Sequence, residues 1–111
     1  MRVVVGGRQV GKTTKLVQQI IAENGYDLSE TFYFTPHRPN HVEQIMADLG
    51  VTALPVFVNP VSVVDRREKL HGHSDWPVYV DDAETILLHI CGERPQAITM
   101  TAEEVDVLHA P

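Results

Sequence analysis

The chain has little cysteine and no long apolar run. Its 111 residues include one cysteine, Cys91, so a disulfide within the chain is excluded. No segment approaches the roughly 20 consecutive apolar residues that a membrane-spanning helix needs. The apolar run that follows Met1 is also far shorter than the roughly 7–15 residues of a signal-peptide core. These absences predict a protein of the reducing cytoplasm that has no membrane partner.

Positive charge is also scarce. Nine Lys and Arg residues stand against fifteen Asp and Glu residues, which gives a formal net charge of −6. This balance argues against a broad basic surface for nucleic acid, although a local basic patch remains compatible with it. Hydrophobic residues at 43% and charged residues at 22% are ordinary values for a globular domain. The length predicts one domain over 1–111, without an internal repeat or linker.

A glycine cluster near the start of the chain lies between two apolar runs. The stretch VVVGGRQVGKTTKLVQQII, from Val3 to Ile21, begins with β-branched residues and ends with apolar residues at helical spacing. It predicts a short buried strand, a loop and a helix over 12–24. Residues 6–13 satisfy the pattern G-x-x-x-x-G-K-[ST] between these two elements.

Each part of this pattern has a physical role in holding phosphate. The N–H groups of such a loop converge on phosphate oxygens, and the helix N-terminus adds partial positive charge. Lys12 can reach the β and γ phosphates, and the Thr13 hydroxyl can ligate Mg²⁺. The alternative is a glycine turn that caps an ordinary helix, but a chance match is expected in only a few chains per thousand, as an order of magnitude. The expected nucleotide-binding residues are Gly6, Gly7, Arg8, Gln9, Val10, Gly11, Lys12, Thr13 and Thr14.

The rest of the chain alternates between strand and helix patterns. The helix after the second strand is predicted to begin with a capping box of Asn40 and Glu43 and to end at Gly50. The next helix is predicted to begin at Asn59-Pro60 and to run to Leu70. Later strands are predicted in the segments TFYFTP, LPVFVNP, PVYVDD and QAITM.

The last part of the chain completes an α/β pattern. A fourth helix is predicted from Ala83 to Cys91, and a short final helix is predicted after Thr101, capped by Thr101 and Glu104. Five strands alternating with helices predict a three-layer sandwich around a mainly parallel five-stranded sheet. Ligands of such sheets bind at the carboxyl ends of the strands. That rule selects the positions after Val5, Val80 and Met100.

Two adjacent carboxylates, Asp81 and Asp82, end the strand predicted in PVYVDD. Alone, such a pair is more often a helix N-cap beside a solvated neighbour. Together with the loop GGRQVGKT, it resembles the two sequence motifs of the P-loop NTPase superfamily. The resemblance implies ATP as the ligand and Mg²⁺ as the cofactor, held by Thr13 and Asp81.

The residue after Asp81 bears on the reaction. In the family branch with an additional catalytic acid, a glutamate here polarises the attacking water, whereas this chain has the shorter Asp82, with Glu84 two positions further on. The resemblance therefore implies that Asp82 or Glu84 orients water and that Lys12 neutralises phosphate charge. The motif layout resembles RecA-like and helicase-like cores, in which a strand lies between the loop strand and the acidic strand. That strand would end near Thr99 and Thr101. Their hydroxyls would then be γ-phosphate sensors, or Thr101 would simply be a helix N-cap.

Other side chains allow two interpretations each. Thr35, His37 and Arg38 are contacts to a partner or polynucleotide, or they form a turn and helix cap. An arginine finger could come from Arg66, Arg67 or Arg94, whereas Arg66, Arg67 and Lys69 also suit a helix C-terminus or solvent. His71, His73 and Asp75 either ligate a metal or lie in a solvated loop, which we favour. Trp76 is expected to anchor that loop by packing.

These features predict a minimal P-loop ATPase that hydrolyses nucleotide slowly and needs self-assembly or a protein partner. The small size and motif layout also resemble reduced P-loop proteins of bacteriophage genomes, which suggests a role in DNA metabolism. A noncatalytic nucleotide-responsive interaction module is the main alternative, and a nucleoside or nucleotide kinase is a weaker one. The sequence leaves the base specificity and the oligomeric state open.

Overall fold

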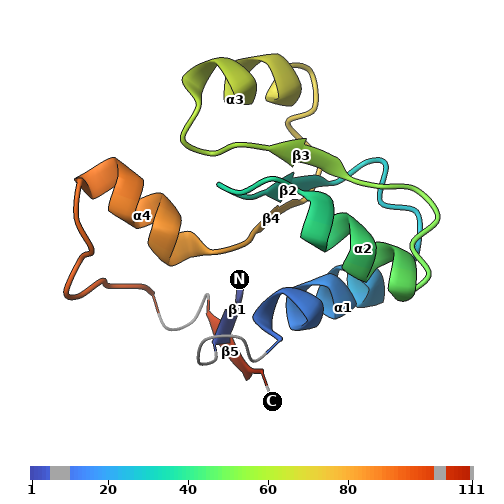
Figure 1. The fold of residues 1–111 in the computed structure, drawn as a ribbon, viewed down its shortest axis with the longest axis horizontal. Helices are drawn as coiled ribbons and strands as arrows, with labels where there is room; N and C mark the ends of the chain where they lie inside the picture. The colour runs from blue at the N-terminus through green and yellow to red at the C-terminus, as the bar shows by residue number, and fades with distance from the viewer. Residues whose placement is uncertain (6–10, 102–104, 111) are drawn as a thin grey trace.

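The structure is a computed structural model that describes residues 1–5, 11–101 and 105–110. Within these ranges the chain is an α/β protein in which helices connect parallel strands (Figure 1). The elements are β1 (Arg2–Val5), α1 (Lys12–Asn24), β2 (Phe32–Phe34), α2 (Asn40–Asp48), β3 (Val56–Val58), α3 (Val63–Leu70), β4 (Val78–Val80), α4 (Ala83–Cys91) and β5 (Asp106–His109).

The described strands form two small parallel sheets. In one sheet β2 lies between β3 and β4, so that Tyr33 is paired with Phe57 on one side and with Tyr79 on the other. In the other sheet β1 pairs with β5. The predicted parallel α/β architecture is therefore confirmed, whereas the prediction of one five-stranded sheet is wrong. The pairing of β1 with β5 and of β4 with β2 leaves the strands in separate ladders.

The fifth strand lies in a different segment from the one predicted. Residues 96–100 are exposed and form no strand, and Asp106–His109 instead pairs with β1. The segment QAITM offers a single β-branched aliphatic residue, whereas Val105, Val107 and Leu108 supply an apolar sequence that suits a strand. The predicted final helix is wrong over 106–109 for the same reason. Its expected cap partner, Glu104, lies outside the described residues.

Helices α1 and α4 have the predicted bounds, but α2 and α3 begin differently. Asn40 is the first residue of α2 rather than its cap, and no side chain caps that helix. Helix α3 begins only at Val63, where the Ser62 hydroxyl accepts a hydrogen bond from the Asp65 N–H at 3.1 Å. The predicted cap residue, Asn59, instead accepts a hydrogen bond from the Val61 N–H in a local turn.

The hydrophobic core lies where α1 and α2 pack side by side against the three-stranded sheet (Figure 1). Helices α3 and α4 contribute no fully buried residue. The domain therefore depends on the same helix, α1, that begins at the end of the glycine motif. No helix in the described ranges is long and apolar enough to cross a membrane. The buried core side chains are Val17, Ile20, Leu28, Tyr33, Val42 and Met46.

Two isoleucines test this distribution of packing. Ile20 on α1 is 1% exposed, whereas Ile90 on α4 is 69% exposed. We expect Ile20→Ala to lower the free energy of unfolding by about 2–5 kcal/mol, because it leaves a cavity in the core. Ile90→Ala should change it by less than about 0.5 kcal/mol. Urea unfolding of both variants measures the difference, and equal losses would contradict the packing described for α4.

Candidate functional site

The structure describes the last part of the glycine motif. Gly6, Gly7, Arg8, Gln9 and Val10 were predicted to bind phosphate and lie outside the described residues. Gly11 has a φ of 76°, in the left-handed region, and a Cβ atom there would meet nothing within 4 Å. The backbone conformation, rather than a close neighbour, therefore favours glycine at this position.

Helix α1 begins directly after Gly11 with Lys12, Thr13 and Thr14. No side chain caps its N-terminus, and its first turn contains no acidic residue. The partial positive charge of this helix end is therefore not neutralised by a carboxylate of its own first turn. This arrangement suits an external anion such as phosphate.

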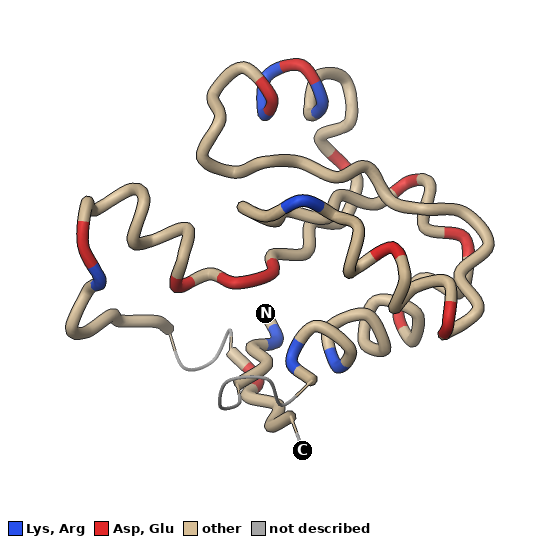
Figure 2. The backbone as a smooth tube through the Cα atoms, viewed as in Figure 1, with Lys and Arg blue, Asp and Glu red and all other residues tan. Residues whose placement is uncertain are grey.

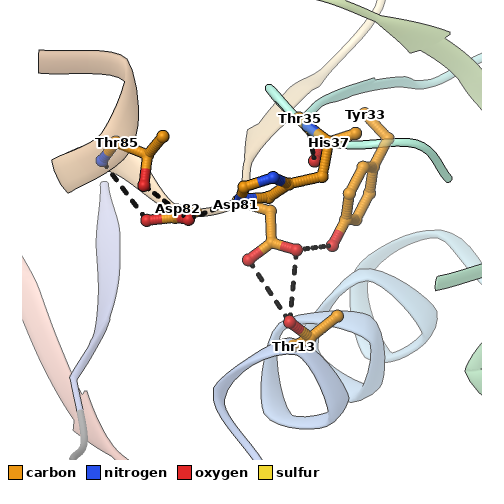
Figure 3. Close-up of polar contacts among 7 residues, drawn as sticks. All are labelled: Thr13, Tyr33, Thr35, His37, Asp81, Asp82 and Thr85. Carbon is orange, nitrogen blue, oxygen red and sulfur yellow. Dashed lines mark hydrogen bonds and ion pairs between the residues drawn. The ribbon is translucent and has the colours of Figure 1, made fainter. Parts of the chain in front are cut away.

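The structure brings together Thr13 and Asp81, the two residues predicted to ligate Mg²⁺. Asp81 follows β4, and its N–H donates to the carbonyl of Phe34 at 2.8 Å, which extends the β2–β4 ladder to the edge of the sheet. The Thr13 hydroxyl lies 3.2 Å and 3.4 Å from the two carboxylate oxygens of Asp81 (Figure 3). Residues from the first turn of α1 and from the end of β4 therefore share one partly buried site.

The Thr13–Asp81 pair fits the chemistry of Mg²⁺. This ion prefers oxygen ligands at about 2.0–2.1 Å in octahedral geometry, so its neighbouring ligands lie about 3 Å apart. The spacing of the hydroxyl and carboxylate oxygens is close to that value. Within the described ranges no group of three or more His, Cys, Asp or Glu residues could hold a metal. A magnesium ion here would therefore complete its coordination with water and phosphate oxygens.

Tyr33 is a site residue that the sequence analysis missed. Its hydroxyl donates a hydrogen bond to the Oδ2 atom of Asp81 at 2.7 Å (Figure 3). The residue is fully buried, and burial together with the negative charge of Asp81 raises the pKa of Tyr33 far above its usual value. The hydroxyl therefore stays protonated and donates to the carboxylate. The signal in the sequence is a tyrosine inside a buried strand, since a buried hydroxyl needs a polar partner.

Asp82 caps helix α4 and contacts His37. Its backbone has a φ of 57°, and its carboxylate accepts hydrogen bonds from the Thr85 N–H at 3.3 Å and the Thr85 hydroxyl at 2.7 Å. The Nε2 atom of His37 lies 2.7 Å from Oδ2 of Asp82. Burial alone would raise the pKa of Asp82, but the contacts with His37 and Thr85 outweigh it and hold the pKa below its usual value. The N-cap interpretation of this carboxylate is therefore confirmed, whereas its role in orienting water stays a prediction.

The segment after β2 joins this network. Thr35 is buried, and its hydroxyl accepts a hydrogen bond from the His37 N–H at 3.2 Å. His37 and Arg38 are exposed. The contact between Thr35 and His37 supports the turn interpretation of this segment, whereas no side chain caps the helix that follows. Glu84 is exposed in the first turn of α4, next to Asp82. The charges in Figure 2 follow this layout, with acidic positions running from the end of β4 into α4 and basic positions at the start of α1.

The remaining candidates lie apart from this network. Arg66, Arg67 and Arg94 are exposed, and no ion pair joins them to it within the described residues. Thr99 and Thr101 are exposed and lie outside any strand. In the loop that contains His71, His73 and Asp75, the His73 ring stacks on Trp76 with centroids 3.8 Å apart. Trp76 also packs against Phe32 at 5.2 Å, so it anchors the loop as predicted.

Comparisons with known proteins give no match. A scan of the chain against protein-family models finds none that fits it, and neither the curated proteins nor the solved structures include a match. The function is therefore inferred from the residues and contacts of this chain. The main observation is the cluster of side-chain oxygen atoms from Thr13, Tyr33 and Asp81.

The lowered pKa of Asp82 leads to a pH-dependent prediction for the metal-free protein. Asp82→Asn removes the charge, while asparagine still suits an N-cap and a left-handed backbone. We expect the variant to be less stable by about 1 kcal/mol at about pH 7, because it loses hydrogen bonds to a charged group. A lowered folded-state pKa stabilises the protein above the unfolded-state pKa, and this contribution is lost as the pH falls through the folded-state value.

The difference between wild type and Asp82→Asn should therefore shrink as the carboxylate becomes protonated below about pH 4. Urea unfolding at a series of pH values, with a chelator present, measures it. Asp75→Asn is the control, because Asp75 is exposed and lies away from α4. A difference between wild type and Asp82→Asn that stays constant down to low pH would contradict the charge-dependent role of Asp82.

Proposed function

We propose that this chain is a minimal P-loop domain that binds Mg²⁺ with a nucleoside triphosphate, most readily ATP, and hydrolyses it slowly. The observation that carries the proposal is the contact of 3.2 Å between the Thr13 hydroxyl and the Asp81 carboxylate. These residues come from distant parts of the sequence, and they are the two that the motif resemblance selects as magnesium ligands. The G-K-T sequence at the start of α1 adds a lysine beside the pair.

In this proposal the first turn of α1 holds the phosphates. Its N–H groups and the loop before it donate to phosphate oxygens, and the Lys12 ammonium neutralises charge on the β and γ phosphates. Mg²⁺ bound between Thr13 and Asp81 would polarise the same phosphate groups. The uncapped helix end and the absence of an acidic residue in its first turn support this assignment.

The proposed hydrolysis is slow because the water-orienting groups are poorly placed for it in the isolated chain. Both oxygens of Asp82 accept hydrogen bonds from Thr85, and one of them also contacts His37. Glu84 is exposed on α4. An arginine from a neighbouring copy or a partner, with Arg66, Arg67 and Arg94 as the candidates within a homo-oligomer, would add the charge stabilisation that fast hydrolysis needs.

A nucleotide-responsive interaction module without catalysis is the second candidate. The engagement of Asp82 as the cap of α4 favours it, because a carboxylate that stabilises a helix is not free to orient water. In that case nucleotide binding changes the surface of the domain that a partner protein recognises. The two candidates share the nucleotide site and differ in turnover.

Lys12→Ala tests the nucleotide site. We expect this variant to bind an ATP analogue roughly 10- to 100-fold more weakly in the presence of Mg²⁺, because it loses hydrogen bonds between charged groups. Lys15→Ala is the matched control, since Lys15 lies on the same helix three positions after Lys12 and outside the G-K-T sequence. Its affinity should remain within about threefold of wild type. Calorimetric titration measures both, and unchanged affinity in Lys12→Ala would refute the site.

Phosphate release separates the two candidate functions. For a self-assembling ATPase we expect the specific rate to rise with protein concentration, as neighbouring copies complete the site. The double variant Asp82→Asn, Glu84→Gln should lose this turnover while it keeps nucleotide affinity. A rate that stays at background at every concentration, with binding intact, would favour the noncatalytic module.

A further inference from the structure

Tyr33 has a fixed ring and a hydroxyl that reaches the candidate magnesium site. The side chain is fully buried in the core cluster together with Val17, Ile20 and Met46. Its ring meets the ring of Phe57 edge-on, with centroids 5.5 Å apart and an interplanar angle of 65°. The core therefore fixes the direction of the hydroxyl that donates to Asp81.

A second tyrosine in the same sheet directs its hydroxyl to different partners. Tyr79 is the register partner of Tyr33 on β4. Its hydroxyl donates to the Oε2 atom of Glu23 at 2.5 Å and accepts a hydrogen bond from the Asn24 side chain at 2.7 Å. Glu23 and Asn24 end α1, whereas the partner of Tyr33, Asp81, lies against the first turn of that helix. The Tyr79 hydroxyl therefore bonds to the last residues of α1, whereas the Tyr33 hydroxyl bonds to the carboxylate that contacts the first turn of this helix.

The two oxygens of Asp81 have unequal surroundings. Oδ2 accepts the Tyr33 hydroxyl at 2.7 Å and lies 3.2 Å from the Thr13 hydroxyl. Among the described residues, Oδ1 has only the longer Thr13 contact, at 3.4 Å. A hydrogen bond from a rigid donor limits rotation of the carboxylate. It therefore leaves Oδ1 as the oxygen with free acceptor capacity.

We propose that Tyr33 is a positioning residue that holds Oδ2 of Asp81 and thereby presents Oδ1 to Mg²⁺. This inference rests on the proposed function, because it assigns Asp81 to a magnesium ion. Tyr33 acts through the carboxylate and does not touch the phosphates. Its loss should therefore weaken the binding of Mg²⁺ at Asp81 and leave the contacts between Lys12 and the nucleotide intact.

The test is the binding of an ATP analogue at increasing Mg²⁺ concentrations to wild type, Tyr33→Phe and Tyr79→Phe. Phenylalanine keeps the buried ring and removes only the hydroxyl. We expect Tyr33→Phe to need roughly tenfold more Mg²⁺ for half-maximal binding, as for other partners of metal ligands. Its affinity for the analogue in a chelator should equal that of wild type. Tyr79→Phe, the matched control, should keep the wild-type Mg²⁺ requirement.

A double-mutant cycle adds a readout that a merely structural role would not give. In an Asp81→Asn background, Tyr33→Phe should cause no further change in the Mg²⁺ requirement. A wild-type Mg²⁺ requirement in Tyr33→Phe would overturn the inference. An equal loss of affinity with and without Mg²⁺ would overturn it too, because that pattern indicates a damaged fold. If wild type binds the analogue but shows no Mg²⁺ dependence, the metal assignment fails; if it does not bind at all, the proposed function fails first.

Discussion

The contact between Thr13 and Asp81 is the interaction on which the candidate site depends. It joins the first turn of α1 to the end of β4, and the Tyr33 hydroxyl connects the same carboxylate to the core. The helix that packs Val17 and Ile20 into the core is therefore also the helix that positions the site. Stability and the proposed function share this element, since a shift of α1 would move the hydroxyl away from the carboxylate.

Much of this arrangement could be predicted from local sequence. The bounds of α1 and α4 follow from apolar residues at helical spacing and from the glycines that end both helices, and both are confirmed. The pairing of Thr13 with Asp81 could be predicted from the motif resemblance, which assigns both residues to one magnesium ion, although β1 and β4 lie in separate sheets. The fifth strand could not be predicted in this way, because strand formation in a short segment depends on which distant partner it meets. Tyr33 was missed for the same reason, since its role depends on a residue far away in the sequence.

The Asp82 carboxylate has a structural role as the N-cap of α4 and a proposed catalytic role in orienting water. Its left-handed backbone and its contacts with Thr85 and His37 make it the start of α4. Those contacts lower its pKa and keep it ionised, but they also occupy both of its oxygens. In the proposed function this arrangement accounts for slow turnover, because the carboxylate that would orient water is engaged in the cap of α4. Rearrangement at the start of α4, on assembly or on binding a partner, is then the step that would release the carboxylate.

The central claim is that Thr13 and Asp81 hold a divalent ion beside a bound nucleoside triphosphate. The most direct measurement is a crystal structure with Mn²⁺ in place of Mg²⁺ and a nonhydrolysable ATP analogue, with the ion located by its anomalous scattering. The account predicts an ion ligated by the Thr13 hydroxyl and the Asp81 carboxylate, with the β and γ phosphates next to Lys12. An analogue bound elsewhere, or a bound analogue whose ion lies away from both residues, would contradict it.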